Sequence, residues 1–106
     1  MAHGVIVSVP ASIDMYRAVN SQVTEQIGDT APPGLLVHVA RETADGFQVI
    51  EVWESKRQCD DFGDTVLAPI IDRLSKGQAP SRNDVSEEFD VENFFVGAGV
   101  AGASSR

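Results

Sequence analysis

His38 stands inside an otherwise apolar run, Leu36-Val37-His38-Val39. Imidazole titrates near neutral pH, so a histidine in such a place can act as an acid, a base or a hydrogen-bond donor. The same residue could instead be a core or interface histidine whose ring nitrogens are satisfied by their neighbours. We predict that His38 is the acid/base group of a small-molecule site.

Glu51 is the natural partner of His38, because a carboxylate between Ile50 and Val52 is unusual in a strand. In one hairpin register His38 lies opposite Glu51 and Leu36 opposite Trp53. A slip of one residue places His38 opposite Ile50 instead. The sequence leaves this register open, and it leaves open whether Glu51 points to solvent or to a partner subunit. We predict Glu51 as the second catalytic residue.

Trp53 and Tyr16 are the aromatic residues most able to line a site, and we predict that both bind substrate. The alternatives are core packing for Trp53 and a helix–sheet contact for Tyr16. Cys59 lies on the apolar stripe of a predicted helix, so we interpret it as structural. Asn93 is interpreted as making a strand-end hydrogen bond.

Two motif-like patterns carry no function. Residues 97–102 fit G-x-G-x-x-G, but only four residues follow, too few for the helix that must hold a pyrophosphate. Several acidic residues are clustered without a glycine-turned loop to gather them around a cation, and alternation along a strand would separate them. We interpret this cluster as a solvated strand face: Asp84, Glu87, Glu88, Asp90 and Glu92.

The elements that must position these residues follow from periodicity and from start and stop signals. Ser12 and Gly28 are suited to begin and end a first helix. Ser55 and Gln58 form the capping-box pattern of a second helix, and Pro69 should kink it. Gly46 could supply a positive φ in the turn between the central strands. The predicted strands span 4–9, 35–40, 47–53 and 85–96, and the helices span 13–27 and 56–76, the second with a kink after about Asp64.

This β-α-β-β-α-β order is the ferredoxin-like α+β pattern, a four-stranded antiparallel sheet with two helices on one face. Residues 1–96 should form one domain, followed by a flexible Gly/Ala/Ser-rich tail at 97–106. The first two strands are apolar on nearly every residue, so the uncovered sheet face should be apolar as well. We therefore predict a homodimer that pairs through this face.

Composition excludes several classes of partner. The chain has 106 residues, with 8 Lys and Arg against 16 Asp and Glu, for a net charge of -8. Nucleic acids and anionic membranes require a basic surface, so neither is an expected partner. The single cysteine excludes an intramolecular disulfide and a cysteine-based zinc site, and the first residues do not resemble a signal peptide. We expect a cytoplasmic protein without a metal or other cofactor, and a small apolar or aromatic ligand.

A family resemblance adds to this pattern. The runs Leu35–Ala40, Asp45–Phe47 and Val52–Ser55, with Phe62 and Leu67–Pro69, resemble the dimeric α/β-barrel superfamily, and most closely its small antibiotic biosynthesis monooxygenase-like proteins. The resemblance implies the paired ferredoxin-like fold. Its members include cofactor-independent oxygenases, haem-degrading enzymes, isomerases, cyclases and proteins without known activity. The haem-degrading members use a histidine on the second helix, and this chain has none between residues 55 and 76.

Two functions remain open on this basis. The chain could be a cofactor-independent monooxygenase or a cyclase acting on a small aromatic or polyketide-like substrate, with His38 as the acid/base group. It could also be a non-catalytic ligand-binding or scaffold protein of the same fold, since nothing resembles a nucleophile beside its base. A cavity lined by His38 and further polar groups would favour the first function.

Overall fold

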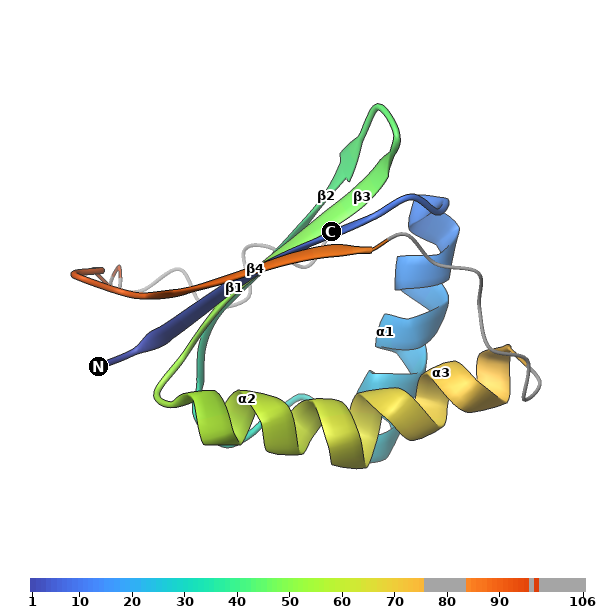
Figure 1. The fold of residues 1–106 in the computed structure, drawn as a ribbon. Coiled ribbons are helices and arrows are strands. Elements are labelled where there is room, and N and C mark those ends of the chain that lie inside the picture. Colours follow the sequence, from blue (N-terminus) through green and yellow to red (C-terminus); the bar gives the residue numbers. More distant parts are fainter. Residues whose placement is uncertain (76–83, 96, 98–106) are drawn as a thin grey trace.

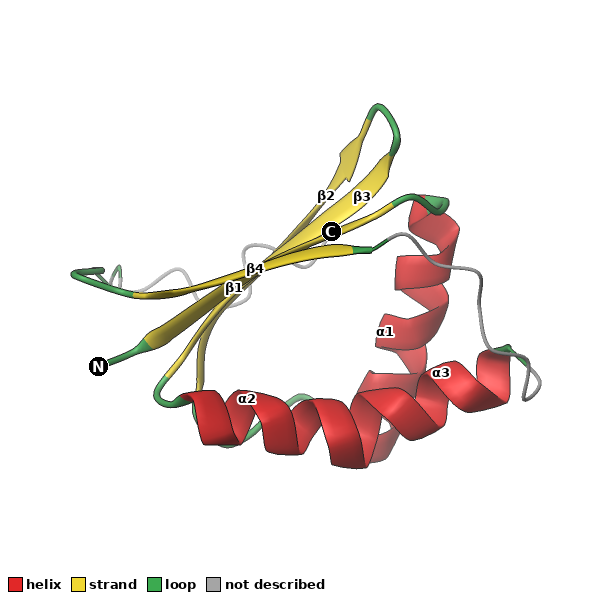
Figure 2. Ribbon diagram, viewed as in Figure 1, coloured by secondary structure: helices red, strands yellow, loops and turns green. Residues whose placement is uncertain are grey.

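The computed structural model describes residues 1–75, 84–95 and 97. The strands are β1 (His3–Val9), β2 (Leu35–Thr43), β3 (Gly46–Trp53) and β4 (Val85–Asp90). They form one antiparallel sheet in the order β2-β3-β1-β4. The helical elements are α1 (Ile13–Ile27), α2 (Lys56–Phe62), the π-helical turn η1 (Gly63–Leu67) and α3 (Ala68–Leu74). Figures 1 and 2 show all helices on one side of the sheet, which confirms the predicted ferredoxin-like fold class.

Strand pairing assigns the side chains to two faces, because residues directly opposite one another share a face. Trp53 contacts Phe62 of α2 and Phe47 contacts Tyr16 of α1, so the odd-numbered residues of β3 face the helices. Glu51 therefore also points toward the helices. The even-numbered residues of β3 point to the uncovered face, which we call the open face of the sheet.

Local signals set the ends of α1 as the sequence predicted. The Ser12 hydroxyl accepts a hydrogen bond from the backbone N–H of Asp14 at 3.1 Å, which satisfies one of the free donors of the first turn. Gly28 ends the helix with a φ of 76° and donates its N–H to the Thr24 carbonyl. That backbone conformation favours glycine.

The second helical segment begins at the predicted cap but accommodates Pro69 in an unexpected way. The Ser55 hydroxyl accepts from the Gln58 N–H at 3.2 Å and donates to the Gln58 side chain at 2.9 Å. Pro69 has no N–H to donate, and the turn before it widens into η1, where the Ala68 N–H bonds to the Gly63 carbonyl five residues back. The expected kink is thus a π-turn within a curved, continuous helical segment (Figure 1).

The predicted ends of the last strand and of the last helix are wrong, and so is the predicted φ of Gly46. The last strand ends at Asp90 and not at residue 96, with residues 91–95 outside any strand. The last helix ends at Leu74. Gly46 does not have a positive φ, but a Cβ there would lie 2.0 Å from the Val9 carbonyl oxygen, so glycine is required by close backbone approach. The predicted tail lies outside the described residues except for Gly97, and the single domain at 1–96 stays a prediction.

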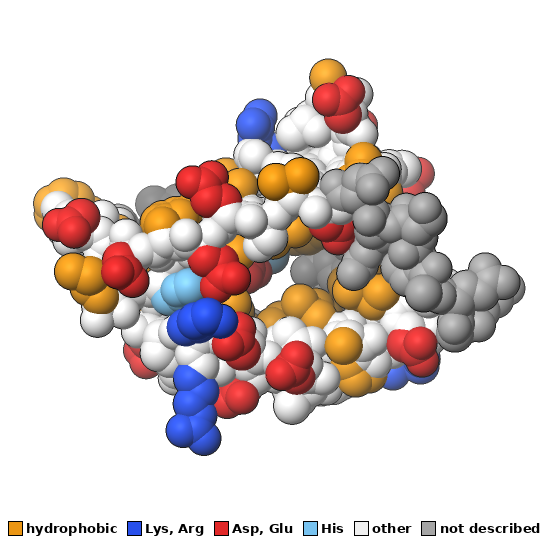
Figure 3. All heavy atoms as spheres, in the orientation of Figure 1, with side chains coloured by type: hydrophobic (Ala, Val, Ile, Leu, Met, Phe, Trp, Pro, Cys, Tyr) orange, Lys and Arg blue, Asp and Glu red, His pale blue; other side chains and the backbone are white. Residues whose placement is uncertain are grey.

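Among the described residues, few side chains are fully enclosed between the two layers. The buried hydrophobic residues of the described chain are Val5, Phe47, Trp53 and Ile70. Figure 3 shows the molecule hollowed between the sheet and the helices, with hydrophobic side chains along the hollow. No described helix is long and apolar enough to cross a membrane.

The open face is apolar at one end and polar at the other. Val39 is 46% exposed and Phe89 is 38% exposed; Ile50 lies beside Val39, and Val52 lies in the same row as Phe89, separated from it by Gly4 of β1. At the polar end, Arg41 donates to Gln48 at 3.0 Å, and Gln48 donates to Ser8 at 3.2 Å. The face therefore combines exposed apolar surface with one polar row that crosses three strands.

Candidate functional site

His38 and Glu51 lie directly opposite each other on β2 and β3, which decides the register that the sequence left open. Nδ1 of His38 is 2.6 Å from Oε2 of Glu51. A regular ladder in this register would pair Leu36 with Trp53, but β2 bulges between Leu35 and Val37 and places Leu35 opposite Trp53. The bulge leaves the His38–Glu51 pair intact.

Tyr16 reaches the same histidine from α1. Its hydroxyl lies 2.7 Å from Nε2 of His38, and the two rings stack with centroids 6.0 Å apart. Burial, together with the negative charge of Glu51, raises the pKa of Tyr16 above its ordinary value. The phenol therefore keeps its proton at neutral pH and is available as a hydrogen-bond donor.

Trp53 contacts Glu51 at the carboxylate oxygen that does not face His38. Its indole N–H donates to Oε1 of Glu51 at 3.0 Å, and its side chain has no exposed surface. A residue without accessible surface cannot wall a pocket in this conformation, so the predicted substrate contact by Trp53 is not what this geometry favours. Phe62 packs against the indole with centroids 5.6 Å apart.

The four predicted site residues thus form one hydrogen-bonded chain, Tyr16–His38–Glu51–Trp53, which we call the relay. Its direction follows from the one partner that can only donate, the indole N–H. An ionised Glu51 accepts from Trp53 at one oxygen and from His38 Nδ1–H at the other. A neutral His38 then accepts from the Tyr16 hydroxyl at Nε2.

A groove lies over the outer end of the relay, between α1 and the edge strand β2. Its volume is about 640 Å³. Tyr16 and His38 belong to its floor, while Glu51 is shielded behind them, with side-chain exposures of 33% for His38 and 14% for Glu51. Polar residues lie along the rim on both elements: Arg17, Asn20, Ser21, Arg41 and Glu42. The arrangement can bind a small molecule against an imidazole whose partners are fixed.

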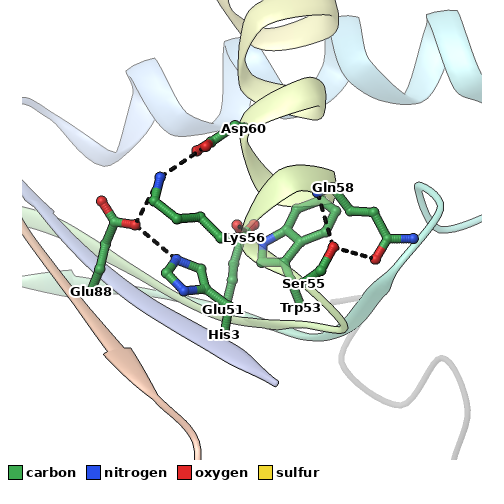
Figure 4. Close-up of polar contacts among 8 residues, drawn as sticks. All are labelled: His3, Glu51, Trp53, Ser55, Lys56, Gln58, Asp60 and Glu88. Carbon is green, nitrogen blue, oxygen red and sulfur yellow. Dashed lines mark hydrogen bonds and ion pairs between the residues drawn. The ribbon is translucent and has the colours of Figure 1, made fainter. Parts of the chain in front are cut away.

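Sequence reasoning missed a second polar cluster at the opposite edge of the sheet. His3 is buried at the start of β1, with Nε2 2.8 Å from Oε1 of Glu88 but without the alignment of a hydrogen bond. Lys56 lies 3.7 Å from Glu88 and 2.8 Å from Asp60, which ties β4 to α2 (Figure 4). The pairing of β1 with β4 brings His3 to Glu88, and the position of α2 adds Lys56, so no local pattern could have revealed the His3–Glu88–Lys56 contacts.

The remaining candidates are accounted for as follows. Burial, followed by the charge of Glu51, raises the pKa of the Cys59 thiol to about 11, so the thiol is protonated at neutral pH. Asn93 is exposed and lies beyond the end of β4. Glu87 and Glu88 point to opposite faces, since they pair with neighbouring residues of β1. Within the described residues, no group of three or more His, Cys, Asp or Glu could hold a metal ion.

Comparison with solved structures shows that the fold is similar to that of proteins described as antibiotic biosynthesis monooxygenases, the group that the sequence resembles. A proposed antibiotic biosynthesis monooxygenase from Caulobacter crescentus is 16% identical, with a TM-score of 0.62, and the match covers 87% of this chain and 91% of that one. The corresponding protein from Chloroflexus aurantiacus is 20% identical, with a TM-score of 0.57 and coverages of 92% and 100%.

SnoaB, a cofactor-independent oxygenase from Streptomyces nogalater, is 12% identical, with a TM-score of 0.55 and coverages of 88% and 93%. No family model matches the sequence, and no curated protein matches it. At these identities the similarity establishes the shared fold alone. The function has to be argued from the residues of this chain.

Proposed function

We propose that this protein is a cofactor-independent monooxygenase acting on a small aromatic, polyketide-like substrate. The observation that carries the proposal is the relay, in which a groove-facing histidine is held by a carboxylate at 2.6 Å on one ring nitrogen and by a phenol at 2.7 Å on the other. A base oriented in this way is what proton abstraction from an acidic C–H requires. The fold shared with the oxygenase SnoaB supports the same reading.

The chemistry needs one base and molecular oxygen. A methylene group between two aromatic rings that are conjugated to a carbonyl is acidic, and loss of a proton gives a carbanion that can reduce O₂ directly. The resulting hydroperoxide loses water, so that the CH₂ group and O₂ become C=O and H₂O. In this chain the substrate proton passes to Tyr16 Oη as the phenol proton moves to His38 Nε2, and Glu51 stabilises the imidazolium that forms.

The substrate would lie in the groove between α1 and β2. Ile13 and Ala40 offer apolar contact, while the rim residues can bond to ring hydroxyls. The groove volume of about 640 Å³ falls within the range of small-molecule sites. Tyr16 would bind the substrate as predicted, and Trp53 would act through its hydrogen bond to Glu51 without contacting the substrate.

The test is oxygen consumption with 1,8-dihydroxyanthrone as probe, alongside formation of the corresponding anthraquinone. His38→Ala and Glu51→Gln should each lower the enzymatic rate by roughly 100-fold, since a positioned base typically contributes 10²–10⁴-fold. Glu25→Gln is the matched control, because Glu25 is an exposed carboxylate on α1. Wild-type activity in His38→Ala would refute the proposed role. Conversion of a polyketide substrate without oxygen consumption would assign the same base to a cyclase.

The alternative is a non-catalytic ligand-binding or scaffold protein. One observation favours it: both ring nitrogens of His38 and both oxygens of Glu51 are satisfied within the relay itself. In this alternative, the network stabilises and specifies the fold and has no catalytic role. The alternative predicts probe binding, or none, without turnover, together with a loss of stability in the relay variants.

We also propose that the protein is a homodimer that pairs through the open face and is located in the cytoplasm. The exposed apolar residues at one end of that face, including Val39 and Phe89, support the pairing. Sedimentation velocity over a range of concentrations would test it. A monomer at all concentrations would refute the dimer.

A further inference from the structure

The indole N–H of Trp53 donates to one acceptor, Oε1 of Glu51. Its side chain has no exposed surface, so water cannot replace Glu51 as its partner. A buried N–H left without an acceptor is costly, so the bond to Glu51 is strongly favoured whenever the protein is folded. The carboxylate is thereby anchored through Oε1.

Anchoring one oxygen fixes what the other can do. Oε2 faces Nδ1 of His38 at 2.6 Å, and an ionised carboxylate can only accept. The proton of a neutral His38 must therefore sit on Nδ1, although free histidine favours the proton on Nε2. The lone pair is left on Nε2, the atom that meets Tyr16 at the groove.

We infer that Trp53 is a positioning residue: its indole N–H holds Glu51 so that His38 keeps its proton on Nδ1 and presents an unprotonated Nε2 to the groove. Trp53 has no contact surface for a substrate, so it acts through Glu51. Phe62, at the end of α2 where η1 begins, packs against its ring with centroids 5.6 Å apart. The catalytic meaning of this inference rests on the proposed function, whereas the tautomer does not.

The tautomer can be read directly from ¹⁵N chemical shifts of the histidine rings at neutral pH, because protonated and unprotonated ring nitrogens differ widely. The chain has two histidines, and His3→Gln assigns the signals. The wild type should show His38 with its proton on Nδ1. Trp53→Phe keeps an aromatic ring against Phe62 but removes the N–H, and it should shift His38 toward a mixture of both tautomers.

A more conservative replacement guards against misfolding. Trp53 is the only tryptophan of the chain, so incorporation of benzothienylalanine replaces its N–H with sulfur at that position alone. Phe62→Leu is the control, because it loosens the packing around the indole and leaves the N–H in place. The inference requires the tautomer to change with sulfur and to persist in Phe62→Leu. An unchanged tautomer in the sulfur analogue would overturn it.

Kinetics separate this inference from the proposed function. If the wild type oxidises 1,8-dihydroxyanthrone, loss of the N–H should lower kcat by roughly 10- to 100-fold, as for the outer partners that orient metal-bound histidines. KM should stay within about twofold, because Trp53 does not touch the substrate. If the wild type is inactive, the proposed function fails while the ¹⁵N measurement still decides the role of Trp53. A raised KM with unchanged kcat would show a binding role and overturn the inference.

Discussion

Replacing Glu51 with leucine should destabilise the protein by about 2 kcal/mol, and this value follows from the partners that Glu51 leaves behind. The Trp53 N–H would be buried without an acceptor, which costs ~1–3 kcal/mol. His38 is 33% exposed, so water can take over much of its lost bond. Removing a mostly buried carboxylate also relieves a desolvation cost, which offsets part of the loss.

Urea unfolding at fixed protein concentration, followed by circular dichroism, measures this effect. For a domain of this size, about 2 kcal/mol corresponds to a fall in Tm of roughly 8 °C. The urea m-value should be unchanged, and Glu25→Leu on the exposed face of α1 should change the free energy of unfolding by less than about 0.5 kcal/mol.

A double-mutant cycle makes the test specific to the relay. In Trp53→Phe the orphaned donor no longer exists, so Glu51→Leu should cost less in that background, with a coupling energy of about 1 kcal/mol or more. Strict additivity of the two substitutions would mean that the 3.0 Å contact between the indole and Glu51 contributes nothing. Glu51→Leu with wild-type stability would refute the reasoning altogether.

Three further predictions concern the framework. Gly46→Ala should lower the free energy of unfolding by ~1–3 kcal/mol, because its Cβ would collide with the Val9 carbonyl. Gly63→Ala, with open space around its Cβ, should raise the free energy of unfolding by ~0.5–1 kcal/mol. Thermal melts compare the two variants, and equal effects would contradict the close approach at Gly46. Cys59 has a pKa of about 11, against 9.0 for an unperturbed thiol, so it should react with iodoacetamide roughly 100-fold more slowly at pH 8 than an unperturbed thiol. The rate should rise about tenfold for each unit of pH. A rate that levels off near pH 9 would contradict the raised pKa. Val39→Glu, on the open face, should shift the sedimentation coefficient to that of a monomer without lowering thermal stability below that of a wild-type monomer, and an unchanged dimer would place the interface elsewhere.

Part of the site could be predicted from sequence because its residues are unusual where they stand. A histidine and a glutamate inside apolar strands are expensive to bury unless they are paired, which made His38 and Glu51 candidates before any geometry was known. The relay itself could not be predicted. Tyr16 lies 22 residues from His38, and only the packing of α1 on the sheet brings its hydroxyl to Nε2.

Irregularities in the strands and helices also could not be predicted from the sequence. The bulge between Leu35 and Val37 shifts one pair of the β2–β3 ladder, and nothing in that apolar run marks it. Pro69 indicated that the helix would be irregular, but whether the helix breaks, kinks or widens depends on the contacts that hold both halves in place. The role of Trp53 changed for a similar reason, because burial that depends on α2 turns a possible pocket wall into an anchor.

The sequence by itself determined the order of elements, the helix caps at Ser12 and Ser55, and the ferredoxin-like class, since these depend on periodicity and on bonds between near neighbours. The tertiary structure decided the register that pairs His38 with Glu51, the meeting of Tyr16 with His38, and the His3–Glu88 contact. Each of these joins residues far apart in the chain. Such contacts depend on how whole elements pack, which no local pattern of residues records.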